Sequence, residues 1–359
     1  MTDLSTFFVP GPTWVRPEIL AEMTRPMIGH RSAEFRELCG RVFDDLRKLF
    51  LTSGNVFVAA SSGTGLLEGA LLNCVPRRVL VTTCGAFSER WREIAQQLGV
   101  EVDILEHEWG KPVDAERLAT HFTGRRYHYD AVTFTHNETS TGVLNDLEAL
   151  TAVVHAESHD TLILVDAVSS LACTPIAFDD WKIDVCIAST QKGLALPPGL
   201  TLFAVSERAL EAARKKAYRG TYFDFLLFDK HAREGNVPFT PSVSHFYALA
   251  AQLEHILRVE SIETRWARHL QLRDMTIERT AAFCQLMADE SHASPSITAL
   301  APRKLEPSVL LARMKERGYT LASGYGRWKP AGIRIGHMGD ISLESLSAML
   351  DVLAEVADA

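Results

Sequence analysis

The sequence lacks the long apolar run that a membrane-spanning helix requires. None of its hydrophobic stretches approaches the roughly 20 consecutive apolar residues of such a helix. The first residues, MTDLSTFFVPGPT, contain neither a basic start nor a long apolar stretch, so they are not typical of a secretory signal. We therefore expect a cytoplasmic protein that does not bind membranes.

Cysteine pairs and positive charge are also scarce. The six cysteines form no C-x-x-C pair, which argues against a disulfide framework or a zinc site, so we interpret them as reduced, mostly core residues. The 37 Lys and Arg against 45 Asp and Glu give a net charge of −8, which is not typical of a protein that binds nucleic acid. The rest is ordinary globular composition, with 47% hydrophobic residues, enough for a large core.

Apolar, β-rich runs alternate with helical patterns from about residue 33 to residue 260. Continuous apolar strands between helices predict an α/β fold with a mainly parallel, doubly wound seven-stranded sheet. The expected strands are 55–60, 77–83, 100–105, 129–136, 161–168, 183–190 and 200–206, and the expected helices are 32–50, 64–73, 87–99, 147–158 and 206–217. A long helix follows at about 242–259, and then mixed patterns, with Cys284 in a helical stretch. We expect a large domain over 17–258 and a smaller C-terminal α+β domain over 259–359.

The first expected strand runs into SSGTG, residues 61–65, and then into a helix. Small residues let the backbone approach an anion, and a helix N-terminus offers free N–H groups and a positive dipole end. A dinucleotide-binding loop is the rival interpretation. However, the glycines are spaced G-x-G-x-x-x-G instead of G-x-G-x-x-G, and the next strand does not end in an acidic residue for a ribose. A phosphate cradle and a plain capped turn remain equally good interpretations of this segment taken alone.

Asp166 and Lys192 each follow an apolar strand, and ligands of open α/β sheets bind at the carboxyl ends of the strands. Asp166 is a cap, a structural ion-pair partner, or a counter-charge for a protonated pyridine nitrogen. A lone lysine after a strand is usually solvated, but one between desolvating walls has a lowered pKa and can form a Schiff base. Together with the anion cradle, these residues supply the three groups that pyridoxal phosphate requires.

Other strand ends carry residues suited to the same ligand. Phe87 can stack on a planar ring or simply fill the core, and Thr139 offers a hydroxyl or only belongs to a turn. Arg334 lies inside an apolar strand, where its planar fork fits either a substrate carboxylate or a structural ion pair. His337 and Asp340 are interpreted as a turn or cap, and we expect no metal site.

Nine segments in order along nearly the whole chain resemble class V aminotransferases, in particular the alanine–glyoxylate and serine–pyruvate branch. They are PGPT (10–13), GHRSAEF (29–35), SSGTGLLEGALLN (61–73), GAFSERW (85–91), THNETSTGVLND (135–146), VDAVSSL (165–171), STQKGLALPPGL (189–200), TPSVSHFYAL (240–249) and IRIGHMGD (333–340). The resemblance implies a fold type I pyridoxal 5'-phosphate enzyme, a homodimer with shared active sites, and an N-terminal segment, 1–16, that contacts the active site or the partner subunit.

The resemblance also implies a role for each site residue. Lys192 carries the cofactor as a Schiff base, Asp166 pairs with the pyridine nitrogen, Phe87 stacks on the ring, Thr139 lies near the ring hydroxyl and Arg334 binds the substrate carboxylate. The implied phosphate contacts are Ser62, Gly63, Thr64, Gln191 and, from the other subunit, Thr240. Thr64 replaces a histidine, and Val237 a tyrosine, of the animal glyoxylate enzymes, and no role is assigned to Val237.

The implied reaction is a ping-pong transamination from alanine or serine to glyoxylate or pyruvate. An acidic donor, aspartate or phosphoserine, is the alternative if Arg31 points into the site; otherwise Arg31 caps a helix or pairs with Glu34. His30 is a second candidate near the substrate. A cysteine desulfurase would usually have histidine where Gln191 stands, and a mobile nucleophilic cysteine. A kynureninase-like enzyme, a nicotinamide dehydrogenase and a non-catalytic relative are further alternatives, and the last would be expected to have lost Lys192 or Asp166.

Overall fold

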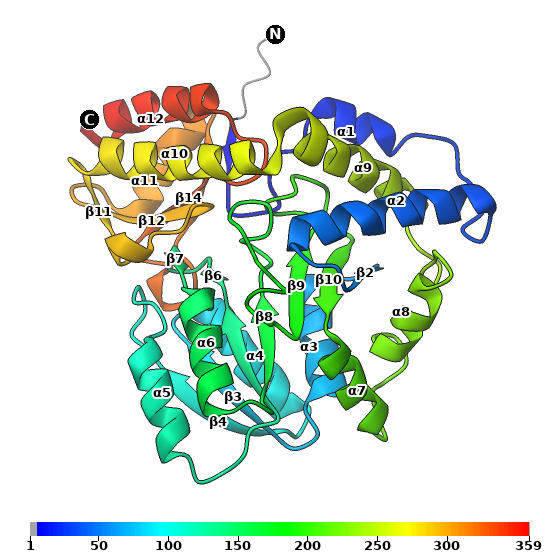
Figure 1. Ribbon diagram of the computed structural model, residues 1–359. Coiled ribbons are helices and arrows are strands. Elements are labelled where there is room, and N and C mark those ends of the chain that lie inside the picture. Colours follow the sequence, from blue (N-terminus) through cyan, green and yellow to red (C-terminus); the bar gives the residue numbers. More distant parts are fainter. Residues whose placement is uncertain (1–5, 359) are drawn as a thin grey trace.

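The computed structural model describes residues 6–358, so part of the predicted N-terminal segment lies outside the described residues. A seven-stranded sheet forms the larger part of the molecule (Figure 1). Its strands, in spatial order, are β2 (Asn55–Ala59), β10 (Thr201–Val205), β9 (Val185–Ser189), β8 (Leu162–Asp166), β5 (Ala131–Thr135), β3 (Arg78–Thr83) and β4 (Glu101–Glu106). Only β10 runs antiparallel to its neighbours, so the predicted mainly parallel sheet is confirmed.

Helices cover both faces of this sheet, as expected for strands that are apolar on both sides. One core lies under α3 (Gly63–Cys74), α4 (Ala86–Gln97), α7 (Glu207–Lys215) and α8 (Phe225–Ala232). The other lies under α2 (Ala33–Phe50), α5 (Ala115–Gly124), α6 (Leu147–Glu157) and α9 (Val243–Glu254). Successive residues of one strand alternate between the cores: Val79 and Val81 face the first, and Leu80 faces the second.

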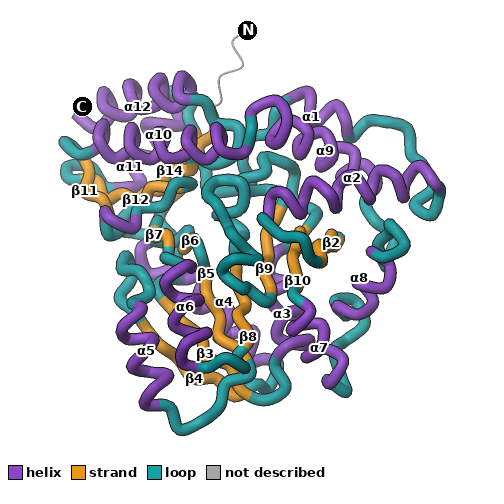
Figure 2. The backbone as a smooth tube through the Cα atoms, viewed as in Figure 1, coloured by secondary structure: helices purple, strands orange, loops and turns teal. Residues whose placement is uncertain are grey.

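A second, five-stranded sheet lies above the carboxyl ends of the large sheet, and loops gather between the two (Figures 1 and 2). Its order is β1 (Phe7–Phe8), β13 (Thr320–Ser323), β14 (Ile333–Gly336), β12 (Ile297–Pro302) and β11 (Cys284–Leu286). The strands pack with α10 (Ile262–Thr280), α11 (Pro307–Glu316) and α12 (Leu343–Asp358) around a core of their own. The remaining short elements are α1 (Pro17–Glu22), β6 (Asn137–Glu138), β7 (Val143–Leu144), a π-helical turn (His255–Glu260) and two 3-10 turns (Glu290–His292 and Gly326–Trp328).

Two local expectations are wrong. Cys284 does not lie in a helix, because α10 ends at Thr280 and Cys284 pairs in a strand opposite Pro302, with its side chain buried in the small core. Asp340 is the hub of a buried ion-pair cluster rather than a simple cap. Its two carboxylate oxygens accept from Arg16 at 2.7 Å and from the fully buried Arg265 at 2.8 Å. This cluster joins the N-terminal segment, α10 and the loop after β14.

None of the helices within residues 6–358 is long and apolar enough to cross a bilayer.

Candidate active site

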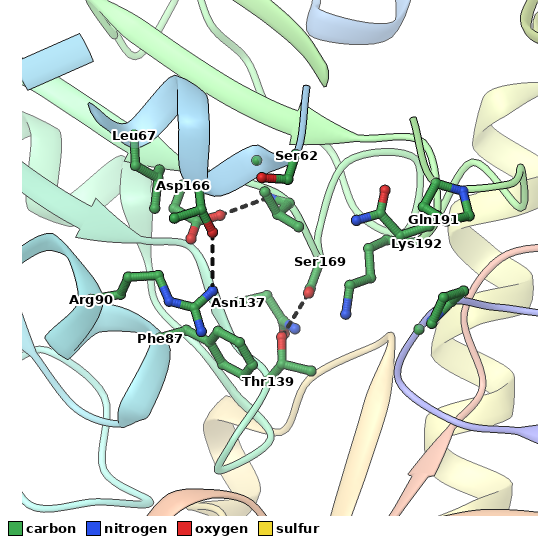
Figure 3. A pocket seen from close by; sticks show the side chains of 16 residues that line it. Ser62, Leu67, Phe87, Arg90, Asn137, Thr139, Asp166, Ser169, Gln191 and Lys192 are labelled. Carbon is green, nitrogen blue, oxygen red and sulfur yellow. Dashed lines mark hydrogen bonds between the residues drawn. The ribbon is translucent and has the colours of Figure 1, made fainter. Parts of the chain in front are cut away.

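One cavity of about 250 Å³ opens at the carboxyl ends of β8 and β9, and Figure 3 shows the side chains around it. This volume is close to the lower end of the range for small-molecule sites, which is roughly 300 Å³. Most of the predicted site residues line it: Ser62, Gly63, Thr64, Phe87, Thr139, Asp166, Gln191 and Lys192. Parallel strands bring these residues to one edge from positions more than 100 residues apart.

The anion cradle is the N-terminus of α3, which begins at Gly63 with Ser62 as its N-cap. The first N–H groups of a helix have no partner within it, and Gly63 and Thr64, which carry the first two in α3, line the cavity. A Cβ atom on Gly63 would lie 2.7 Å from Val168 Cγ2 and 2.8 Å from Ser189 Oγ. Because these contacts are shorter than real Cβ atoms show, only glycine lets the cradle pack this closely.

Asp166 is the last residue of β8, and only 7% of it is exposed. Its Oδ1 accepts a hydrogen bond from Val168 N at 2.9 Å. The pKa of the Asp166 carboxyl is raised to about 6, mainly by burial and also by the nearby negative charge of Glu138. The hydrogen bond from Val168, together with Arg90 and Lys192, opposes this rise.

Lys192 follows β9, and its side chain is enclosed by protein except where it faces the cavity. Burial lowers the pKa of the Lys192 amine to about 8, and the positive charge of Arg334 contributes, while Asp166 acts in the opposite direction. Lys192 Nζ donates to the carbonyl of Pro10, and Thr13 Oγ1 donates to the Lys192 carbonyl at 3.2 Å. The N-terminal segment of the same chain therefore packs against the lysine.

Phe87 is held at the cavity by a buried carboxylate. Glu138, which is fully buried, accepts from the backbone N–H of Phe87 at 3.1 Å and of Ser88 at 2.8 Å, and also from Ser140. An anion at a helix N-terminus is electrostatically favourable, so Glu138 fixes the start of α4. The Phe87 ring stacks on Tyr325, with ring centroids 4.9 Å apart.

Arg334 lies beside the cavity, in the middle of β14, but does not line it. Its Nε donates to the Ser323 carbonyl at 2.9 Å and its Nη1 to the Thr139 carbonyl at 3.2 Å. Within the described part of the chain Arg334 forms no ion pair, and burial lowers the pKa of its guanidinium to about 10. The alternative of a structural ion pair is therefore not seen in residues 6–358.

Thr240 and Arg31 lie away from this cavity. Thr240 lines a separate hollow together with Tyr222 and Phe239. Arg31 donates to the carbonyls of Val237 at 2.7 Å and Pro238 at 2.9 Å, so it holds the segment that carries Thr240. This is none of the three roles expected for Arg31, because Ser32 caps α2, Arg31 makes no ion pair with Glu34, and Arg31 does not line the cavity. Neither His30 nor Arg31 lines the cavity.

The cavity also contains residues that the sequence reasoning did not select. The remaining lining residues are Gly11, Pro12, Leu67, Arg90, Asn137, Val168, Ser169 and Pro198. Asn137, Val168 and Ser169 are neighbours of selected residues at strand ends, and Arg90 lies one helical turn after Phe87. Both the adjacency to strand-end residues and the helical spacing from Phe87 can be read from the sequence. Thr139 Oγ1 donates to Ser169 Oγ at 2.6 Å, so Ser169 orients the Thr139 hydroxyl.

The family model for class V aminotransferases matches residues 15–338. This chain belongs to the class V aminotransferases. A serine–glyoxylate aminotransferase from Methylorubrum extorquens is 36% identical over 94% of this chain and 87% of that protein. A soluble hydrogenase small subunit from Synechococcus sp. is 36% identical over 99% of this chain and 94% of that protein. The crystal structure of an alanine–glyoxylate aminotransferase from Nostoc sp. superposes with a TM-score of 0.92, at 27% identity, over 99% of this chain and 96% of that one.

This protein is therefore a fold type I transaminase, and its cofactor is pyridoxal phosphate. The residues of the cavity fit this cofactor. A side chain larger than glycine at position 63 would clash with the wall of the α3 cradle. The carboxylate of Asp166 and the amine of Lys192 line the same cavity, and the ring of Phe87 forms one wall. Asn137 also lines the cavity, and its Oδ1 atom has no hydrogen-bond partner within residues 6–358, so it is available to a ligand.

Proposed function

We propose that this chain transfers the amino group of alanine or serine to glyoxylate or pyruvate, with Lys192 as the residue that binds the cofactor and moves the proton. The observation that carries the proposal is the buried amine of Lys192, whose pKa is lowered to about 8, in one cavity with the buried carboxylate of Asp166. A lysine in this state is a nucleophile and a base near neutral pH.

The cavity residues divide by the part of the cofactor that each would hold. Ser62, Gly63, Thr64 and Gln191 would bind the phosphate, with the helix end of α3 supplying N–H groups. Asp166 would face the ring nitrogen. Phe87 and Val168 would cover the ring, and Thr139 would lie near its hydroxyl.

When bound, pyridoxal phosphate supplies the carbonyl that captures the amino group and the ring that accepts the electrons of the Cα–H bond. Arg334 would bind the substrate carboxylate and fix the orientation of Cα. Lys192, freed by the incoming amine and neutral in part at physiological pH, would take the proton from the substrate Cα and deliver it to C4′ of the cofactor. Asp166, ionised above about pH 6, would keep the ring nitrogen protonated. A second oxo acid would then reverse these steps.

We include a homodimer with shared sites and a cytoplasmic location in the proposal. Thr240 lies outside its own cavity, which supports a contact with the cofactor phosphate of a neighbouring copy. All six cysteines are free and buried, which supports a reducing compartment. Light scattering is expected to give twice the monomer mass, and a monomer with full activity would contradict the sharing of sites.

The position of Arg31 favours small donors. Its guanidinium is bonded to the carbonyls of Val237 and Pro238, so it is not directed at a substrate side chain in this cavity. The test is to mix the cofactor-loaded protein with alanine, serine, aspartate or phosphoserine and to follow the visible absorption band of the cofactor. Alanine and serine are expected to convert it fastest. Conversion by phosphoserine alone would contradict the preference for small donors.

A further inference from the structure

Arg90 extends from α4 into the cavity, although a charged residue one turn into a helix usually faces solvent. It lies one turn after Phe87, and side chains three residues apart share a helix face. Its Nη1 donates to Thr64 Oγ1 at 3.3 Å, and its guanidinium lies 5.0 Å from the centroid of the Phe87 ring. Figure 3 shows it turned toward Asp166. Arg90 is half-buried and lines the cavity, and it makes no ion pair with any residue in 6–358.

Asp166 has charged neighbours of both signs. It is buried, and the charged groups that act on it electrostatically are Glu138 from β6, Arg90 from α4 and Lys192 from the loop after β9. Glu138 opposes ionisation of Asp166. Lys192, which the proposed reaction uses to move a proton, would not keep a constant charge. Arg90, because guanidinium does not lose its proton in proteins, is the cation that stays throughout the reaction.

We propose that Arg90 is a positioning residue that acts through Asp166, holding this carboxylate ionised and aimed at the nitrogen of the cofactor ring. This inference rests on the proposed pairing of Asp166 with that nitrogen. In this proposal Arg90 does not itself bind the cofactor phosphate, although Thr64, to which it donates a hydrogen bond, belongs to the anion cradle.

The test compares two ligands that differ only at the ring nitrogen. The cofactor-free full-length protein is titrated, by quenching of its intrinsic fluorescence, with pyridoxal phosphate and with 1-deazapyridoxal phosphate, which has a carbon in place of the nitrogen. The ratio of the two Kd values measures the contribution of the nitrogen. Arg90→Gln, which keeps a donor for Thr64 but removes the charge, is expected to lower this ratio by roughly tenfold, the equivalent of one pKa unit at the carboxylate. Arg90→Lys is expected to retain most of the preference for pyridoxal phosphate, because it keeps the positive charge.

Controls assign each outcome. Arg92→Gln, on the same helix but outside the cavity lining, is expected to leave both Kd values unchanged. Asp166→Asn is expected to abolish the preference, and adding Arg90→Gln to it is expected to change the ratio no further. If Asp166→Asn leaves the preference intact, the proposed pairing with the nitrogen fails. If Asp166→Asn removes it but Arg90→Gln weakens both ligands equally, Arg90 acts on the phosphate and the inference is overturned. Equal Kd ratios for Arg90→Gln and Arg90→Lys would also overturn the inference.

Discussion

The lowered pKa of Lys192 predicts how fast its amine reacts in the cofactor-free protein. Burial and the charge of Arg334 move this pKa from its ordinary 10.5 to about 8. Near pH 7.5 about a quarter of the Lys192 amines would then be neutral, against about one in a thousand for an unperturbed lysine, a difference of roughly 200-fold. The neutral fraction rises with pH, so reactivity should increase through a midpoint near pH 8.

Competitive labelling measures this midpoint directly. The cofactor-free protein is treated with trace acetic anhydride between pH 6 and 10, and the peptide that contains Lys192 is quantified by mass spectrometry. The exposed Lys329 is the internal reference for access to the reagent. Arg334→Met should raise the midpoint, because a neighbouring positive charge is lost, and Asp166→Asn should lower it, because a negative charge is lost. A midpoint near 10.5, or no response to either variant, would refute the electrostatic reasoning.

Three further predictions concern the start of α4, the anion cradle and Arg31. Glu138→Ala leaves the buried N–H groups of Phe87 and Ser88 without their acceptor and should lower the free energy of unfolding by about 3 kcal/mol, measured by urea denaturation, whereas the exposed Glu93→Ala should change it little. Gly63→Ala forces a Cβ atom against Val168 and Ser189 and should destabilise the fold by about 1–3 kcal/mol and weaken cofactor binding. Gly124→Ala, with no atom within 4 Å of the added Cβ, is its control, and equal effects at the two sites would contradict the close packing of the cradle. Arg31→Met should leave the ratio of kcat/KM for alanine and aspartate unchanged, because Arg31 bonds to backbone carbonyls; a shift of that ratio toward alanine would show that it contacts the donor.

The large sheet could be predicted because its strands are continuous apolar runs between helices. The site followed from the same pattern, since the residues after parallel strands, such as Asp166 and Lys192, must meet at one edge. At Cys284 the local sequence pattern predicts the wrong structure. Its surroundings have a helical pattern, but pairing of residues 284–286 with β12 outweighs the local preference.

Contacts between distant segments could not be predicted either. The carbonyl of Pro10 reaches Lys192 from 182 positions away, and no local pattern encodes that distance. Arg90 shares a helix face with Phe87, which the sequence indicates, but its contact with Thr64 depends on the placement of α4 beside α3. The sequence leaves Arg31 as a donor contact, a helix cap or a partner of Glu34. Its actual contacts with Val237 and Pro238 depend on a fold-back of the chain over more than 200 residues.

The most direct measurement of the central claim locates the lysine that binds the cofactor. The protein is loaded with pyridoxal phosphate and reduced with borohydride, and the modified peptide is sequenced by mass spectrometry. We expect one adduct, on Lys192, which disappears when alanine is added before the reduction and is absent from Lys192→Ala. An adduct on another lysine, or one that persists in Lys192→Ala together with steady transamination, would contradict this claim.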